Sequence, residues 1–238
     1  MKIRRVVVTG LGALTPIGNS IQEYWNGLIN GVSGSAPITK FNTSNFKTQF
    51  ACELKNYDPT PYFDRKEVRK HDLFSQYAIV STDEAVKDSG LILEQIDLDR
   101  VGVIWGSGIG GITTFLEEVL GYVKGNEIPR FNPFFIPKMI SDIAAGHISI
   151  KYGFAGPNFT TTSACASSAN AIIDSSLYIR NGLADIMVTG GSEAAVNAVG
   201  IGGFGTWYIA DIYKFNSCLH GNFPGFFKGR KGGRRQLG

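Results

Sequence analysis

Cysteine is scarce in this sequence, and long apolar runs are missing from it. Three cysteines, Cys52, Cys165 and Cys218, are spread over 238 residues, too few and too far apart for a disulfide framework or a zinc site. We therefore expect a reducing, cytoplasmic setting and neither a metal nor another cofactor. No stretch approaches the ~18 consecutive apolar residues of a membrane-spanning helix, so no membrane partner is predicted. The start, "MKIRRVVVTGLGAL", is basic and then apolar, but its short, glycine-broken run favours a first β-strand over a signal peptide.

Acidic residues are nearly absent from one end of the chain. Residues 205–238 contain one acid, Asp211, and have a net charge of +5, whereas the other 204 residues carry −2. The six basic residues of this segment are Lys214, Lys228, Arg230, Lys231, Arg234 and Arg235. The segment also lacks helical periodicity. We predict a folded domain over residues 1–204 and a basic, glycine-rich tail over 205–238. Clustered Lys and Arg with glycine can neutralise phosphates, but no aromatic residue interrupts "KGRKGGRRQLG", so no nucleic-acid partner is expected.

Strand and helix patterns alternate through the first 204 residues. The apolar runs "RRVVVTG", "RVGVIWG", "NFTTT" and "ADIMVTGG" are typical of strands covered on both faces. Between them, a capping box at Ser20 and Glu23 predicts a helix that stops at Gly31. Further helices are expected over 64–90, over "ITTFLEEVLGYVKG", and from Pro137 to about Tyr152, and residues 32–62 read as irregular with a short hairpin. This order predicts an α/β fold with a mostly parallel sheet covered by helices on both faces.

Two glycine-rich loops suggest a nucleotide site. "GSGIGG" matches G-x-G-x-x-G through Gly106, Gly108 and Gly111, between a strand and a helix. That fingerprint also needs an acid about 20 residues further on, at the end of the next strand, and Glu127 has the distance but lies in a loop pattern. The alternative is that these glycines let one backbone approach another. A dinucleotide-binding domain is therefore kept as the second hypothesis.

Cys165 has surroundings that suit a nucleophile. The sequence places it between a strand and a helix over residues 166–181, where unpaired N–H groups and the helix dipole stabilise a thiolate. The small residues of "SACASS" leave room for a thioester. The other interpretation is a small buried thiol in a tight turn. The predicted helix has one less polar face, formed by Ala169, Ile172, Ile173, Ser176 and Leu177.

Histidine is the usual base beside a nucleophilic cysteine, and the chain has only three. His71 lies in a charged helical pattern, His147 in a mostly apolar helix, and His220 in the tail. None forms a persuasive pair with Cys165, so residue chemistry alone defines only half of a site.

Several motifs together resemble a known family. "RRVVVTGLGALTPIGN", "SGIGG", "PFFIP", "GPNFTTTSACASSANAI", "ADIMVTGGSEAA" and "GIGGFG" occur in this order. They resemble the elongating β-ketoacyl-acyl-carrier-protein synthases, the thiolase-fold condensing enzymes of type II fatty acid synthesis. The resemblance covers residues 1 to about 205 and implies the N-terminal half of a thiolase-like fold. It implies that Cys165 accepts an acyl group as a thioester, and that malonyl-carrier protein then loses CO₂ and attacks it.

The resemblance also implies roles for other residues. Ile109 matches the position that gates the acyl pocket, and Phe135 and Phe204 match residues that line it. The implied docking residues for acyl carrier protein are Lys66, Arg69, Lys70 and Arg130. The alternative for these basic residues is a solvated helix face. The full-length family implies a homodimer that acts on acyl and malonyl thioesters.

The sequence departs from the family after "GIGGFG". Family members are about twice as long, and their second half brings two catalytic histidines, a lysine and a second oxyanion donor. None of these motifs occurs here, and residues 205–238 match no family segment, as in a truncated or frameshifted reading of a longer gene. We therefore expect the chain to be inactive by itself.

Overall fold

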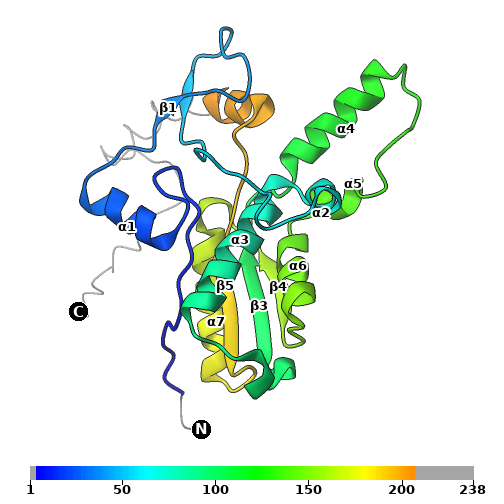
Figure 1. The fold of residues 1–238 in the computed structure, drawn as a ribbon. Helices are drawn as coiled ribbons and strands as arrows, with labels where there is room; N and C mark the ends of the chain where they lie inside the picture. The colour runs from blue at the N-terminus through cyan, green and yellow to red at the C-terminus, as the bar shows by residue number, and fades with distance from the viewer. Residues whose placement is uncertain (1–3, 207–238) are drawn as a thin grey trace, which may run out of the picture.

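The computed structural model describes residues 4–206, and three parallel strands form its centre (Figure 1). The strands are β3 (Val101–Gly106), β4 (Asn158–Thr161) and β5 (Ile186–Gly191), in the order β4-β3-β5. Gly106 pairs in register with Thr161 on one side and Gly191 on the other. All three strands therefore end at one level, and the predicted parallel sheet is confirmed.

Helices cover both faces of this sheet. α3 (Leu73–Asp88) and α6 (Ile143–Tyr152) pack against one face, and α7 (Ser167–Arg180) packs against the other (Figure 1). Every residue of β3 is buried. The core between β3, α3 and α6 includes Phe74, Ile79, Val103, Trp105 and Ile148. Burial on both faces explains why the strand reads as a continuous apolar run.

The remaining elements surround this centre. They are α1 (Ile21–Ile29), β1 (Ala36–Pro37), β2 (Phe50–Ala51), α2 (Arg65–Lys70), the 3₁₀ turns Leu93–Gln95, Leu98–Arg100 and Ala164–Ala166, α4 (Ile112–Lys124), α5 (Phe135–Met139) and a helical segment over 198–206. β1 and β2 pair antiparallel as the expected short hairpin. α4 projects away from the sheet (Figure 1). The capping box before α1 forms: Glu23 N–H donates to Ser20 Oγ at 3.2 Å, and Asn19 N–H donates to Glu23 Oε2 at 2.7 Å.

The prediction of a first strand over "RRVVVTG" is wrong. Residues 4–10 pair with no strand in the described chain, and Val7 and Val8 are 58% and 78% exposed. An apolar run becomes a strand only where a neighbour accepts its backbone hydrogen bonds. The next residues instead lie on α3, where a Cβ on Gly10 or Gly12 would come within 2.2 Å of Ala85 O or 1.9 Å of Ser81 O. The space beside the two glycines of this first loop is therefore occupied by α3.

Two predicted helices are each broken into two. The helix expected over 64–90 is interrupted at His71 and Asp72, because the Asp72 side chain caps α3 by accepting from Phe74 N–H at 3.2 Å. The helix expected from Pro137 stops with α5 and resumes as α6. Its break exposes Met139 O, which accepts from Gly111 N–H at 3.0 Å. The first break is made by a local helix cap, whereas the second coincides with a contact distant in sequence.

The less polar face expected for α7 is not the face that the structure buries. Ser167, Ala171 and Ser175 are the buried residues, spaced four apart. The outward face includes Ala169, Ile172, Ile173 and Leu177. The exposed fractions of Ile172, Ile173 and Leu177 are 53%, 55% and 46%. Small side chains turn inward because the helix lies very close to the sheet, as the glycines described below require.

Some predictions fall outside the described residues. Cys218, His220 and the basic part of the tail belong to residues 207–238, so the division at residue 204 stays a prediction. Within residues 4–206, no helix has both the length and the apolar character needed to cross a bilayer. In the same range no cluster of three or more metal-ligating side chains occurs.

Candidate active site

The candidate site lies where the three parallel strands end. In parallel sheets, ligands characteristically bind outside the carboxyl ends of the strands. β3 leads into the glycine loop at 107–111, β4 leads into the turn that carries Cys165, and β5 leads into Ser192 and Glu193. The matched register of the strands brings these three loops to the same edge.

Cys165 is exposed in a short 3₁₀ turn directly before α7. A set of polar side chains holds this turn. Ser163 N–H donates to Ser167 Oγ at 2.9 Å, Ser167 Oγ donates to Ala164 O at 2.8 Å, and Asn170 Nδ2 donates to Ser163 Oγ at 2.6 Å. Ala164 has φ = 51°, a conformation that costs a non-glycine residue free energy and is typical of functional turns.

The backbone near Cys165 can stabilise an anion. Within residues 4–206, the Cys165 N–H donates to no protein acceptor. It precedes the first turn of a 14-residue helix, where N–H groups and the helix dipole favour negative charge. An exposed thiol beside a free N–H can attack a carbonyl and hold the oxygen that becomes negative.

Glycines on the strands allow α7 to begin so close to the sheet. A Cβ on Gly106 would lie 2.4 Å from Ser167 C, and one on Gly191 would lie 2.0 Å from Ser168 Oγ. Both distances are too short for real atoms. These two glycines therefore place the start of α7, and with it Cys165, directly above the ends of β3 and β5.

The same geometry disfavours a dinucleotide site at "GSGIGG". The space beside each of its three motif glycines is occupied by the protein itself. A Cβ on Gly106, Gly108 or Gly111 would approach α7, Ala164 O at 3.4 Å, or Lys138 O at 2.4 Å, respectively. In that fingerprint the second glycine, here Gly108, lets the backbone approach the pyrophosphate, and a Cβ built on it would already lie 3.2 Å from Glu193 Oε2. The glycines serve backbone packing, as the alternative interpretation held.

Glu193 is a site residue that the sequence analysis did not single out. Its Oε2 accepts hydrogen bonds from Gly108 N–H and Ile109 N–H, each at 2.9 Å. Partial burial of the carboxyl group raises the pKa of Glu193, and the N–H donors of Ile109 and Gly108 oppose this without cancelling it. A sequence signal existed, because an acid lies two residues after a strand that ends in two glycines.

The predicted pocket residues lie in different places. Ile109 lies in the glycine loop with 40% of its surface exposed. Phe135 stacks on Phe131 with ring centroids 5.6 Å apart and lies 6.4 Å from Phe115. Phe204 is 58% exposed on the helix over 198–206. Gly108, the neighbour of Ile109, lies close to Ala164 of the Cys165 turn, whereas the ring contacts of Phe135 are with Phe115 and Phe131.

The predicted docking residues are surface groups. Lys66 and Arg69 are exposed on α2, while Lys70 lies 2.5 Å from Glu67 and is partly neutralised by it. Arg130 is exposed in the loop between α4 and α5. Three of the four predicted docking residues thus share one short helix, and the fourth, Arg130, lies on a separate loop.

Two of the three histidines lie in the described residues, and they pair with each other. His71 and His147 contact each other edge to face, with centroids 4.2 Å apart, and His71 Nε2 lies 3.3 Å from Glu67 Oε2. His71 is 7% exposed. Burial lowers the pKa of both, that of His147 to about 4. They form a structural pair between α2 and α6, as the lack of a convincing base in the sequence indicated.

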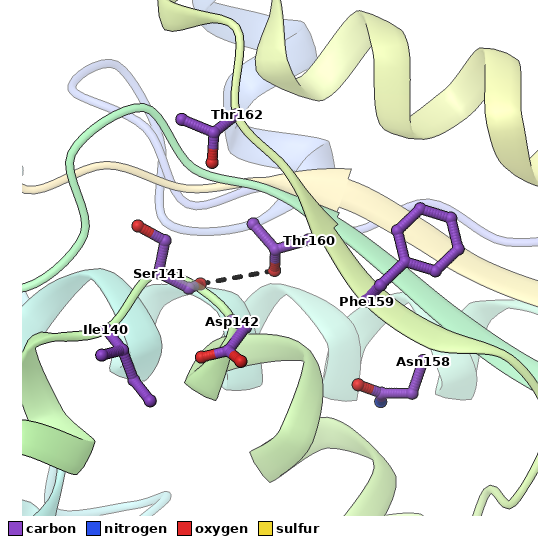
Figure 2. Close-up of a pocket in the computed structure, with 7 residues that line it drawn as sticks. All are labelled: Ile140, Ser141, Asp142, Asn158, Phe159, Thr160 and Thr162. Atoms are coloured by element: carbon purple, nitrogen blue, oxygen red, sulfur yellow. Dashed lines mark hydrogen bonds between the residues drawn. The ribbon is translucent and has the colours of Figure 1, made fainter.

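A separate open pocket lies along β4 (Figure 2). Its lining residues are Ile140, Ser141, Asp142, Asn158, Phe159, Thr160 and Thr162. Thr160 Oγ1 donates a long hydrogen bond, 3.4 Å, to Ser141 O across it (Figure 2). β4 is an edge strand. The pocket contains none of the predicted site residues.

Cys165 thus lies at the carboxyl edge of a parallel sheet, in the turn that leads into α7. Comparison with known proteins identifies the family: residues 3–214 match the family model "Beta-ketoacyl synthase, N-terminal domain". The chain belongs to this family, and its solved neighbours are ketosynthases of the thiolase-like fold.

The similar proteins are all longer. The chain is 40% identical over 229 residues to 3-oxoacyl-[acyl-carrier-protein] synthase 2 of Synechocystis sp., covering 96% of this chain and 54% of that protein. It is 44% identical over 202 residues to the Staphylococcus aureus protein of the same name, covering 84% and 48%. The ishigamide ketosynthase/chain length factor superposes with a TM-score of 0.80 at 26% identity, covering 86% and 51%. The chain spans about half the length of these relatives.

Proposed function

We propose that this chain is the N-terminal half of an elongating β-ketoacyl-acyl-carrier-protein synthase, with Cys165 as the acyl-accepting nucleophile. The observation that carries the proposal is the exposed Cys165 at the start of α7, above the ends of the parallel strands, with its own N–H unpaired in the described chain. Membership of the β-ketoacyl synthase family supports the same assignment.

The first half-reaction follows from this geometry. The Cys165 thiolate attacks the carbonyl carbon of an acyl thioester on the carrier protein. The carbonyl oxygen becomes negative and accepts from the Cys165 N–H. The bond to the carrier sulfur then breaks, the carrier thiolate leaves and takes up a proton, and the acyl group remains on Cys165.

The second half-reaction needs groups beyond those described. Malonyl-carrier protein loses CO₂, and the resulting carbanion attacks the carbonyl carbon of the Cys165 thioester. The bond to Cys165 Sγ then breaks, which frees the thiolate and leaves the β-ketoacyl product on the carrier protein. Donors must stabilise the charge that develops on the malonyl oxygen. His71 and His147 pack against each other below α2, so the two histidines that the family resemblance implies belong to the other half of the protein.

The proposed protein partner is acyl carrier protein. The exposed cations Lys66 and Arg69 on α2 suit an acidic surface. A structure similar to this chain, with a TM-score of 0.71 at 27% identity and coverage of 84% of this chain and 53% of that one, is titled as a type II PKS acyl-carrier protein in complex with its ketosynthase. We assign Lys70 and Arg130 as secondary contacts, Lys70 because Glu67 already pairs with it.

We also propose a homodimer of the complete protein and a cytoplasmic location. The exposed edge of β4 and the exposed apolar side chains of α4, among them Phe115, Leu120 and Val123, suit a protein contact. Cys52 and Cys165 are both free and exposed, which suits a reducing compartment.

Acyl transfer to the chain tests the proposed nucleophile. Incubation with an acyl-carrier thioester should add one acyl mass, located by peptide mass spectrometry at Cys165. Cys165→Ala should remove that adduct, whereas Cys52→Ala, which removes the other exposed thiol of the described chain, should retain it. An adduct on Cys52 in the wild-type chain, or none on Cys165 while the protein is folded, would contradict the assignment.

A further inference from the structure

Glu193 connects the loop that follows β5 to the loop that follows β3. It follows β5, and its Oε2 accepts two adjacent backbone N–H groups, those of Gly108 and Ile109, at 2.9 Å each. The other oxygen lies 3.4 Å from Ala194 N. One carboxylate oxygen therefore fixes two successive peptide units of the loop that follows β3.

That loop has little else to hold its centre. Its ends are tied by Ser107 N–H to Thr161 O at 3.3 Å and by Gly111 N–H to Met139 O at 3.0 Å. Gly110 adopts φ = 79°, and glycine restricts the backbone less than any other residue. Among the described residues, only Glu193 accepts a hydrogen bond from the amides at 108 and 109.

The anchored segment adjoins the Cys165 turn. A Cβ built on Gly108 would lie 3.2 Å from Glu193 Oε2 and 3.4 Å from Ala164 O. Gly108 is thus between the carboxylate and the residue before the nucleophile. Ile109, next to it, is 40% exposed, so a shift of this segment also moves an apolar side chain.

We infer that Glu193 is a positioning residue that holds Gly108 and Ile109 beside the Cys165 turn and so limits the length of acyl group that reaches the thiol. The inference rests on the proposed function for its substrate class. Glu193 does not touch the reacting atoms; it acts through the loop. Release of the loop admits longer chains more readily than short ones.

The experiment has two readouts on the 238-residue chain, neither of which needs a carrier protein. The first is amide hydrogen exchange of the segment 107–111. The second is the ratio of Cys165 alkylation rates by a dodecyl-substituted and an unsubstituted iodoacetamide, followed at the Cys165 peptide. Glu193→Ala should raise exchange at 108 and 109 by about tenfold and raise the long-to-short ratio by roughly threefold or more.

Three further variants distinguish positioning of the loop from an effect on general stability. Two of them are at Glu193 and one is at another residue. Glu193→Gln keeps one oxygen that can accept both N–H groups and should resemble the wild type. Glu193→Asp keeps the charge but is shorter, and should behave like Glu193→Ala. Glu84→Ala is the matched control, because Glu84 also accepts two backbone N–H groups, those of Ala13 and Ile21, at 2.8 Å each but in another loop.

The outcomes are distinct. Unchanged exchange at 108 and 109 in both Glu193→Ala and Glu193→Asp would overturn the inference, as would a freed loop with an unchanged alkylation ratio. If Glu193→Ala raises exchange throughout β3, the other two variants at this position decide. The inference would also be overturned if Glu193→Asp and Glu193→Gln both exchange like the wild type, or if both show raised exchange at 108 and 109. Failure of acyl transfer from carrier protein to Cys165 would instead contradict the proposed function, whatever the exchange shows.

Discussion

Asp72 is only 3% exposed, yet its carboxylate is fully used. It accepts from Phe74 N–H at 3.2 Å, from Thr114 N–H at 3.0 Å and from Thr114 Oγ1 at 2.6 Å. One side chain thus caps α3 and fixes the start of α4, which follows the glycine loop of the site. Buried donors without an acceptor are costly, so this residue links helix capping to the geometry of the site.

Removal of that carboxylate should destabilise the protein. Asp72→Ala leaves three donors without their acceptor, and we expect the free energy of unfolding to fall by roughly 2–4 kcal/mol, measured by urea denaturation. Asp142 is the matched control, since it precedes α6 without accepting a cap hydrogen bond and is exposed. Asp142→Ala should change stability by less than about 0.5 kcal/mol. Equal losses in the two variants would contradict this account of Asp72.

At the scale of elements, α2 is the unit that carries the proposed docking charge. Replacement of both Lys66 and Arg69 by Glu should reduce the association rate of acyl-carrier protein roughly tenfold at low salt, because electrostatic steering is reversed. The salt dependence of the rate should flatten as well. Lys87→Glu, an exposed change on α3, should have little effect. Stopped-flow binding at several salt concentrations measures the association rate and its salt dependence. An unchanged rate would contradict the docking role and mean that α2 is only a solvated helix.

The contact between α2 and α6 predicts a pH effect on stability. Burial lowers the pKa of His147 from its ordinary 6.5 to about 4, and it also lowers the pKa of His71. The groups acting on this pair are Glu67, which favours protonation, and Lys70 and Lys138, which oppose it. The unfolded chain therefore binds protons between pH 6.5 and 4 that the folded chain does not.

Stability from these histidines is present above pH 6.5 and is lost as the pH falls toward 4. We expect His147→Gln to show a shallower decline in unfolding free energy over this window than the wild type, measured by denaturation at several pH values. Carboxylates titrate in both proteins and cancel in the comparison. The same slope in both would contradict a neutral buried pair.

At the scale of the whole molecule, the outward face of α7 exposes apolar side chains to solvent. Ile172, Ile173 and Leu177 are about half exposed, whereas Ala171 is completely buried against the sheet. Ile172→Ser should alter the stability of this chain by less than about 0.5 kcal/mol, while Ala171→Leu should cost about 1–3 kcal/mol through overpacking. Thermal denaturation compares them, and the reverse order would mean that the helix packs by its other face.

Condensation is the second property of the whole molecule. We expect the 238-residue chain alone to form no β-ketoacyl product, because the groups that stabilise the malonyl carbanion are missing from residues 4–206, and one such donor is worth about 10²–10³ in rate. An in-frame continuation after Phe204 with the family's second half should restore the product, and Cys165→Ala in that longer protein should abolish it. Sustained product from the chain by itself would contradict this reading.

Residues with local signals were predictable from the sequence. The capping box at Ser20 and Glu23, the buried strand "RVGVIWG" and the turn of Cys165 into a helix depend on neighbours a few residues away, and all appear in the structure. Family motifs added the chemistry of Cys165, which residue types alone left open between a nucleophile and a structural thiol. These are properties that short-range sterics, hydrogen bonding and apolar periodicity encode.

Only the tertiary structure decided which contacts those elements make. "RRVVVTG" has the composition of a strand but no strand beside it, and α7 turns its small residues inward because Gly106 and Gly191 bring the sheet within reach of Ser167 and Ser168. Glu193 finds Gly108 and Ile109 across more than 80 residues of chain. Partners so distant in sequence leave no periodic signal, since a hydrogen bond or a close approach depends on where the folded backbone places both ends.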